Sequence, residues 1–213
     1  MKKGTTNRRA VIRASRVHRT PGRPREFDAE KALQRALRVF WQHGYEGASL
    51  TDLTRAMGIN RPSLYSAFGN KEKLFRSVLD RYARESAGYV SAALEQPSAR
   101  GVVEKILFGT AEVLSDPGHP PGCLMVQGAL ACGSESRGIQ RELSSRRAAG
   151  EGALRERLER AKLEGDLPPA ADAADLAAYV MVVLHGMSVQ AVGGASREKL
   201  RGIAERAMRA WPS

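Results

Sequence analysis

Cysteine and aromatic residues are scarce in this sequence, with two cysteines and 6% aromatic side chains in 213 residues. Cys123 and Cys132 are too few to staple a secreted disulfide scaffold, so we expect a reducing, cytoplasmic environment. Residues 83–213 contain no run in which Val, Ile or Tyr alternates with polar residues between turns, the pattern typical of strands. The sequence therefore predicts an all-α fold.

The usual motifs of catalysis, metal binding and cofactor binding are also missing. Neither His-x-x-x-His nor Cys-x-x-Cys spacing occurs, and the four histidines are scattered at His18, His43, His119 and His185. There is no Gly-x-Ser-x-Gly elbow, no P-loop and no Gly-x-Gly-x-x-Gly fingerprint. We therefore predict that the chain is not an enzyme and that it carries no cofactor and no metal.

One apolar stretch, residues 176–193, raises the question of a membrane span. His185, Ser188 and Gln190 lie within it, and no aromatic or basic anchors flank it. We therefore expect a buried or dimer-forming helix here and no membrane partner.

Positive charge is concentrated at the start of the chain. Residues 1–25 contain nine Lys and Arg and no acidic residue, while the whole chain has a net charge of +11. This segment has no apolar run long enough for a secretory signal, and its composition predicts a disordered basic arm. The extended backbone around Pro21 and Pro24 would let Arg23 lie in a DNA minor groove. A solubilising tail and a mitochondrial transit peptide are the alternatives for this segment.

Residues 26–82 carry the start and stop signals of four successive helices. A good N-terminal cap precedes each helix and a glycine follows each of the first two; the caps are Asp28, Ser49, Asn60 and Asn70, and the glycines are Gly44 and Gly58. The second helix and the third, at 61–68, are short and flank a glycine-containing turn. This pattern predicts a helix-turn-helix unit whose second member is the recognition helix.

Such a unit has the side chains needed to bind DNA. Arg61 begins the third helix, where its guanidinium can reach guanine O6 and N7 in the major groove. Ser49 and Thr51 begin the second helix, where free backbone N–H groups can bind a phosphate, and Lys71 can neutralise another. A packing motif without DNA binding is the alternative, because helix-turn-helix units also occur in that role.

Four ordered motifs make the pattern more specific. They are Gly22-Arg23-Pro24, Ala36-x-x-x-Phe40-x-x-x-Gly44-Tyr45, Ser49-Leu50-Thr51-Asp52-Leu53 and the continuous run from Met57 to Phe75. Together they resemble the DNA-binding domain of the TetR family of transcriptional regulators. The resemblance implies a homodimer through the last two helices and DNA contacts by Thr51, Arg61, Pro62, Ser63, Tyr65 and Lys71. The family commonly has His where this chain has Ala67, so one side-chain donor is missing here.

The remainder of the chain, residues 83–213, carries sixteen basic and sixteen acidic residues and so has no electrostatic reason to bind DNA. Breaks at Pro and Gly predict helices at 71–95, 99–115, 122–133, 137–164, 172–192 and 196–211. The last two have apolar faces that favour a four-helix dimer interface. We thus expect a disordered arm (1–25), a helix-turn-helix DNA-binding domain (26–72) and, joined by a long helix, a larger effector-binding and dimerisation domain (73–213).

Large or polar residues within the apolar helices are candidates to line an effector cavity: Phe108, Met125, Gln127, Tyr179, Met181 and His185. Ordinary core packing is the alternative for each of them.

Cys123 is a separate candidate for an effector-binding residue. It follows Pro120-Pro121-Gly122 and would lie in the first turn of a helix, where the dipole lowers a thiol pKa and favours reaction with oxidants or electrophiles. A small buried hydrophobe is the alternative. On one continuous helix Cys132 would lie about 13.5 Å further along, too far to form a disulfide with Cys123.

These features predict a cytoplasmic, homodimeric repressor that binds a palindromic double-stranded DNA operator and is released by a small-molecule effector. Two alternatives stay open. One is a repressor that senses oxidants or electrophiles through Cys123. The other is a sequence-tolerant architectural DNA binder that uses its basic arm.

Overall fold

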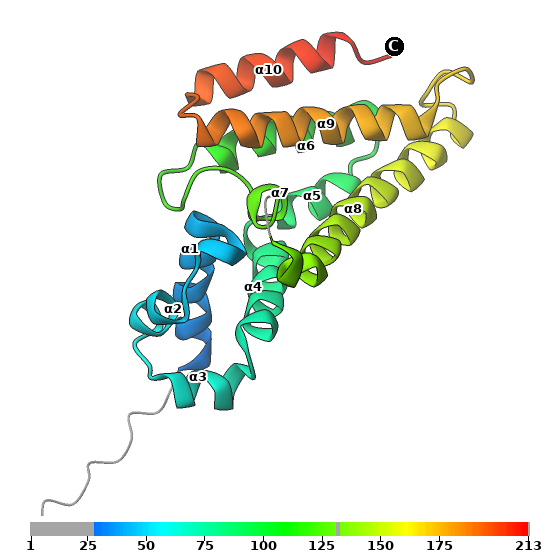
Figure 1. Cartoon of the computed structure of the whole chain (residues 1–213). Coiled ribbons are helices and arrows are strands. Elements are labelled where there is room, and N and C mark those ends of the chain that lie inside the picture. The colour runs from blue at the N-terminus through cyan, green and yellow to red at the C-terminus, as the bar shows by residue number, and fades with distance from the viewer. Residues whose placement is uncertain (1–27, 131–132, 213) are drawn as a thin grey trace, which may run out of the picture.

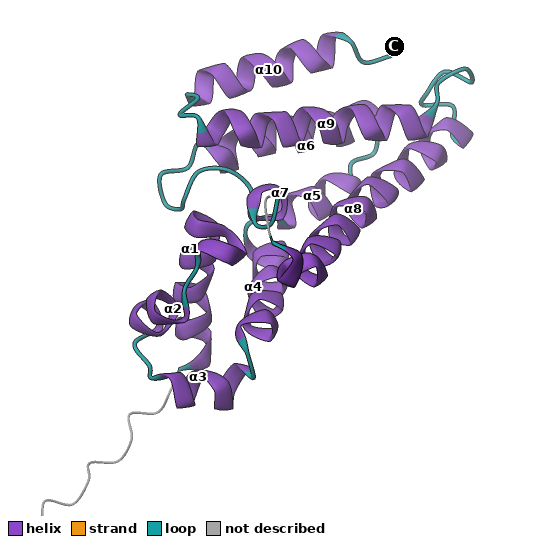
Figure 2. Ribbon diagram, viewed as in Figure 1, coloured by secondary structure: helices purple, strands orange, loops and turns teal. Residues whose placement is uncertain are grey.

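The structure is a computed structural model that describes residues 28–130 and 133–212, and these residues form helices with no strand among them (Figure 2). The expected all-α fold, with an N-terminal helix-turn-helix unit and a larger helical part, is therefore confirmed. The predicted basic arm, Arg23 and Cys132 lie outside the described residues.

Four helices build the N-terminal unit: α1 (Ala29–Gly47), α2 (Leu50–Met57), α3 (Arg61–Phe68) and α4 (Lys71–Glu85). Each is capped by the predicted side chain, because Asp28, Ser49, Asn60 and Asn70 each accept a hydrogen bond from the backbone N–H three residues further on. Gly58 ends α2 in the left-handed conformation. Capping is a local interaction, which explains why these starting points could be read from the sequence.

Gly44 interrupts α1 with φ +67° and ψ −177°. The regular helix ends there as predicted, although a further turn continues to Gly47. A Cβ atom at Gly44 would lie 3.2 Å from the carbonyl oxygen of Gly128, so glycine allows the two backbones to approach. The next residue uses this approach, since the N–H of Tyr45 donates to that carbonyl at 2.8 Å.

The larger part contains α5 (Gly88–Leu94), α6 (Ala99–Leu114), α7 (Leu124–Gln127), the 3₁₀ turn η1 (Ser134–Ser136), α8 (Arg137–Leu163), α9 (Ala173–Val192) and α10 (Arg197–Arg209). Helices α6, α8, α9 and α10 surround a second core that contains Leu107, Leu158, Val180, Leu200 and Ala204. Figure 1 shows α9 and α10 side by side at the end of the molecule opposite α3.

Two of the predicted helices differ from those observed. The helix expected at 71–95 is divided into α4 and α5, because the N–H groups of Ser86 and Ala87 both bond to the carbonyl of Tyr82 and Gly88, a poor helix former, follows. The helix expected at 122–133 is the single turn α7, since the backbone after Gln127 turns to meet α1 through Gly128. The other four agree with α6, α8, α9 and α10 to within two residues.

The N-terminal core reaches beyond the helix-turn-helix. The apolar face of α4 belongs to it, and so do Leu124 of α7 and Ile139 and Leu143 of α8; the α4 residues are Leu74, Phe75, Val78, Leu79 and Tyr82. The predicted domain boundary at 72/73 therefore falls at the start of a helix that packs with the N-terminal unit.

One helix in the described part of the chain, α9, is long and apolar enough to cross a membrane. It packs against α6, α8 and α10 in this structure.

Candidate DNA-binding surface and effector cavity

The outer face of α3 is the first candidate site. Leu64 is fully buried in the N-terminal core, which turns the opposite face of this short helix outward. Arg61 and Pro62 are exposed, Ser63 is partly exposed, and Tyr65 keeps 45% of its surface accessible although it is a large aromatic residue. The structure thus brings four of the predicted DNA-contact residues onto one surface.

The start of α2 lies against the start of α3. Arg61 donates from Nη2 to Oγ1 of Thr51 at 3.2 Å, so two candidate contact residues are joined. Ser49 serves as the N-terminal cap of α2, accepting from the N–H of Asp52 and donating to its carboxylate. This hydrogen bond from Ser49 is the main reason why the pKa of Asp52 is lowered.

Lys71 has a different environment from the other candidates. Its ammonium lies 4.5 Å from the centre of the Tyr45 ring, a cation–π contact. Burial lowers the pKa of Lys71, and the nearby carboxylate of Glu46 opposes this shift. Lys73 was not among the predicted contacts, yet it is exposed in the same first turn of α4. The Lys-Glu-Lys run at the helix start was the signal that could have identified it.

A cavity of about 330 Å³ lies among α4, α5, α6, α7, α8 and α9. Four of the predicted effector residues line it, namely Cys123, Met125, Met181 and His185. The other three lie elsewhere. The ring of Phe108 lies 5.1 Å from the guanidinium of Arg201, Gln127 donates to the carbonyls of Trp41 and Pro121, and Tyr179 is exposed on α9.

The sequence predicted that Cys123 lies in the first turn of a long helix. In the structure it instead occupies the N-cap position of the single-turn helix α7. Its sulfur accepts a hydrogen bond from the hydroxyl of Tyr82 at 3.2 Å. Burial, reinforced by Cys123, raises the pKa of Tyr82 well above its usual value and keeps this hydroxyl protonated. Because α7 ends at Gln127, the helical-distance argument against a Cys123–Cys132 disulfide no longer applies.

Sequence reasoning missed the charged residues of the cavity, Arg146 and Arg147, which are half-buried on α8. Arg147 donates from Nη1 to the carbonyl of Met125 at 2.7 Å. Burial lowers the pKa of His185, and the charge of Arg147 adds to this shift, while Glu151 opposes it. Two adjacent arginines on a helix with an apolar face were the available signal, but arginines on long helices are usually solvated.

The segment 116–128, which carries Cys123, is attached to α1. Trp41 donates from its indole nitrogen to the carbonyl of Gly122 at 2.9 Å and stacks on the ring of His119 with 4.4 Å between centroids. Arg38 donates to the carbonyl of Gly118 at 2.9 Å. Together with the bond from Tyr45 to Gly128, these contacts form a joint between the DNA-binding unit and the cavity wall.

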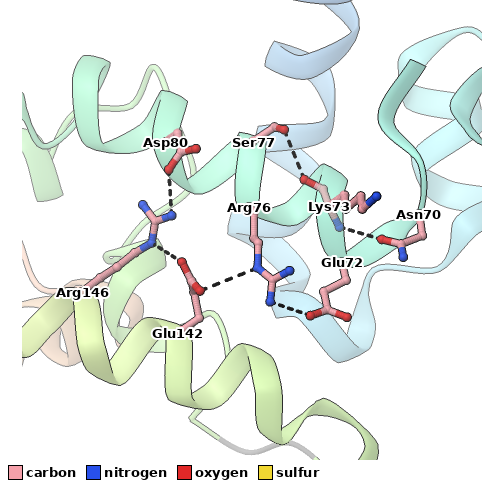
Figure 3. A network of polar contacts seen from close by, with 8 residues as sticks. All are labelled: Asn70, Glu72, Lys73, Arg76, Ser77, Asp80, Glu142 and Arg146. Carbon is pink, nitrogen blue, oxygen red and sulfur yellow. Dashed lines mark hydrogen bonds and ion pairs between the residues drawn. The ribbon is translucent and has the colours of Figure 1, made fainter. Parts of the chain in front are cut away.

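A second connection runs between α4 and α8 through ion pairs (Figure 3). Arg146 pairs with Asp80 of α4 at 2.7 Å and with Glu142 of its own helix at 2.9 Å. Glu142 lies 3.6 Å from Arg76, which pairs with Glu72 at 2.7 Å. The network therefore extends from the cavity wall along α4 to the first turn of that helix, beside the DNA-binding surface.

Comparison with known proteins agrees with this architecture. The family model of bacterial regulatory proteins, tetR family, matches residues 32–78. The HTH-type transcriptional repressor ComR of Escherichia coli (strain K12) is 39% identical over 198 residues, which span 92% of this chain and 94% of ComR.

Solved structures of TetR-family regulators are also similar to this chain. One of them is a cysteine mutant of the TetR family transcriptional regulator CifR, complexed with 26 bp double-strand operator DNA. It is 46% identical to this chain with a TM-score of 0.86, and the match covers 89% of this chain and 100% of that chain. A putative TetR transcriptional regulator from Rhodococcus sp. RHA1 is 43% identical with a TM-score of 0.60, covering 85% of this chain and 97% of that protein.

Proposed function

This chain belongs to the TetR family of bacterial regulatory proteins, and we propose that it binds an operator as a homodimer and leaves it when a small molecule fills the cavity. As a member of this family it is a DNA-binding transcriptional repressor and not an enzyme. We propose the cytoplasm as its compartment.

The observation that carries the proposal is the exposed face of α3. Arg61 and Tyr65 are exposed and Ser63 is partly exposed on this short helix, which lies at one end of the molecule (Figure 1). An arginine at the start of a recognition helix is suited to a bidentate contact with guanine, and the adjacent start of α2 is suited to a phosphate. Ser49, Thr51, Pro62 and Lys71 border the same surface, where we propose DNA contacts for them.

Dimerisation is supported by the surface of α9. Four large apolar residues of this helix are exposed: Tyr179, Val182, Val189 and Val192. Tyr179, Val182, Gly186 and Val189 follow each other at intervals of three and four residues, the spacing of a seam between paired helices. We propose that a second copy covers this seam together with α10. A dimer formed at this end leaves both α3 helices free to enter major grooves one helical turn apart.

Release by an effector is supported by what surrounds the cavity. Its walls include Tyr82 of α4, a helix of the N-terminal unit, and Met125 of α7, which packs against that unit. A ligand that binds one arrangement of these helices better than another shifts the population toward it. If that arrangement changes the separation of the two α3 helices, the affinity for the operator falls.

A thiol sensor is the second candidate, and the position of Cys123 in the cavity wall favours it. A small electrophile that enters the cavity would meet this sulfur next to the hydroxyl of Tyr82. Loss of operator binding on treatment with an electrophile in the unmodified chain, but not in Cys123→Ser, would support this version. An equal response of the two proteins would exclude Cys123 as the sensor.

The first experiment is fluorescence anisotropy of the full chain with duplexes tiled across the DNA upstream of its own gene, at several salt concentrations, with random duplex as the control. A preference of about 10³-fold or more for one duplex is expected of a specific repressor. Equal binding to every duplex with a steep salt dependence would contradict the proposal and favour the architectural binder. Deleting residues 1–25 then separates the contribution of the arm from that of α3.

A further inference from the structure

We propose that the effector of this cavity is a small amphiphilic anion, whose apolar body lies against the cavity walls and whose carboxylate is held by Arg147. The inference rests on the proposed function, because it names the chemical class of effector for the cavity described there. It is carried by the distribution of charge and of unused hydrogen-bond donors around that cavity.

The walls of the cavity are largely apolar. Val90, Leu114, Val126, Met181 and Leu184 contribute aliphatic or thioether surface from three different helices and the α7 turn. A volume of about 330 Å³ is at the small end of the range for small-molecule sites, which excludes large ligands such as dinucleotides. Among the described residues that line it there is no Asp or Glu, so the formal charges on the lining are all positive.

Most polar groups of the lining already have partners. Thr110 donates to the carbonyl of Ile106 and therefore accepts from the hydroxyl of Tyr89, whose pKa is raised to about 12 by burial. Ser188 donates to the carbonyl of Leu184, and Tyr82 donates to Cys123. These groups gain little from a ligand. Ser91 also lines the cavity, but it is exposed and uncharged, so the two arginines and His185 are the groups suited to an anionic end.

The two arginines differ in their ion-pair partners, and this difference identifies Arg147 as the residue that can bind an anion. Arg146 is paired with Asp80 and Glu142, which neutralise its charge. Arg147 has one hydrogen bond, to a backbone carbonyl, and no carboxylate of the described residues lies at ion-pair distance from it. Glu151, one turn further along α8, is exposed and outside the lining. A guanidinium has five N–H donors, so Arg147 keeps free donors and a charge that a carboxylate would match.

The same residue connects the ligand site to the DNA-binding unit. The bond from Arg147 to Met125 ties α8 to α7, and α7 is followed at once by Gly128, which accepts from Tyr45 of α1. A carboxylate that binds the free donors of Arg147 would draw the guanidinium away from the Met125 carbonyl. Its binding would therefore loosen the hold of α8 on α7, and with it the joint to α1.

The test compares three probes of equal length, octanoate, 1-octanol and octylamine, by titration calorimetry with the full chain. We expect octanoate to bind about tenfold to a hundredfold more tightly than 1-octanol, as a charge-assisted bond to arginine implies, and octylamine to bind most weakly. Equal affinities of octanoate and 1-octanol, or tighter binding of octylamine, would overturn the proposal without any substitution.

Variants then locate the anion site. Arg147→Gln is expected to bind octanoate no better than 1-octanol while keeping its affinity for 1-octanol. Arg155→Gln, an exposed arginine two turns further along α8, is the matched control and should behave as the unmodified chain. Retention of the octanoate preference in Arg147→Gln would also overturn the assignment.

The final readout uses the duplex that the anisotropy experiment identifies. Release of that duplex by octanoate and not by octylamine supports both proposals. Release by 1-octanol at the same concentration refutes the anion while keeping the effector cavity. Release by none of the three, together with their failure to bind, refutes the cavity as the effector site.

Discussion

Arg61 stands at the first position of α3 with one guanidinium nitrogen bonded to Thr51 of α2. This bond directs the side chain while it stays exposed, and it leaves the donors that a bidentate contact to guanine requires. Lys71 has the opposite arrangement, because its ammonium already lies on the ring of Tyr45. A phosphate at Lys71 would have to compete with that cation–π contact.

Replacing Arg61 therefore has a defined consequence. We expect Arg61→Ala to weaken binding of the specific duplex by about 1–3 kcal/mol and to relax the preference at a single base pair, while binding of random duplex changes little. Anisotropy with base-substituted duplexes measures both effects. Arg100→Ala is the control, since Arg100 is also exposed but lies on α6 in the larger part of the chain. Equal losses for specific and random duplex would make Arg61 a phosphate contact.

Among the elements, α7 shows where prediction from sequence reached its limit. Apolar residues after Pro121-Gly122 favour a helix on local grounds, and a helix does begin at Leu124. It stops after one turn because Gly128 and Gln127 bond to α1, which is distant in the sequence. The N-terminal caps of α1 to α4 and the glycine that ends α2 were predictable because their partners lie within a few residues, whereas the partners of α7 do not.

The approach of α1 to α7 depends on Gly44, and its replacement should be costly. Gly44→Ala would place a side chain in a backbone region nearly restricted to glycine and against the carbonyl of Gly128, so we expect a loss of about 1–3 kcal/mol in the free energy of unfolding. Gly152→Ala is the matched comparison, because a Cβ there meets nothing within 4 Å inside α8. That change should stabilise the protein by up to about 1 kcal/mol. Urea denaturation measures both.

At the scale of the whole molecule, the DNA-binding unit and the cavity share structure. Leu124, Ile139 and Leu143 come from α7 and α8 but belong to the N-terminal core, and the ion pairs of Arg146 join α8 to α4. The sequence predicted a basic arm, a helix-turn-helix and a larger helical part from local composition and motifs. It did not predict which cavity residues carry charge, because the partner that distinguishes Arg146 from Arg147 is Asp80 on another helix.

The quaternary arrangement gives a prediction at the same scale. Val182 is 68% exposed at the middle of the α9 seam, and burying such a side chain contributes about 1.5–3 kcal/mol. Since a symmetric dimer would bury two copies, Val182→Lys should weaken dimerisation about a hundredfold or more without unfolding the chain. Leu163→Lys is the control, because Leu163 is 89% exposed at the end of α8. Analytical ultracentrifugation measures both, and an unchanged dimer in Val182→Lys would remove this seam from the interface.

Trp41 gives the joint between the two units an optical property. Its indole lies edge-on to Tyr82, is stacked on the imidazole of His119 and donates to the carbonyl of Gly122, the residue before Cys123. The chain has one other tryptophan, Trp211, which is buried in the second core. In a Trp211→Phe protein all indole emission would come from the joint. The emission of Trp41 in such a protein would change whenever segment 116–128 moves against α1, so this movement could be followed without an attached dye.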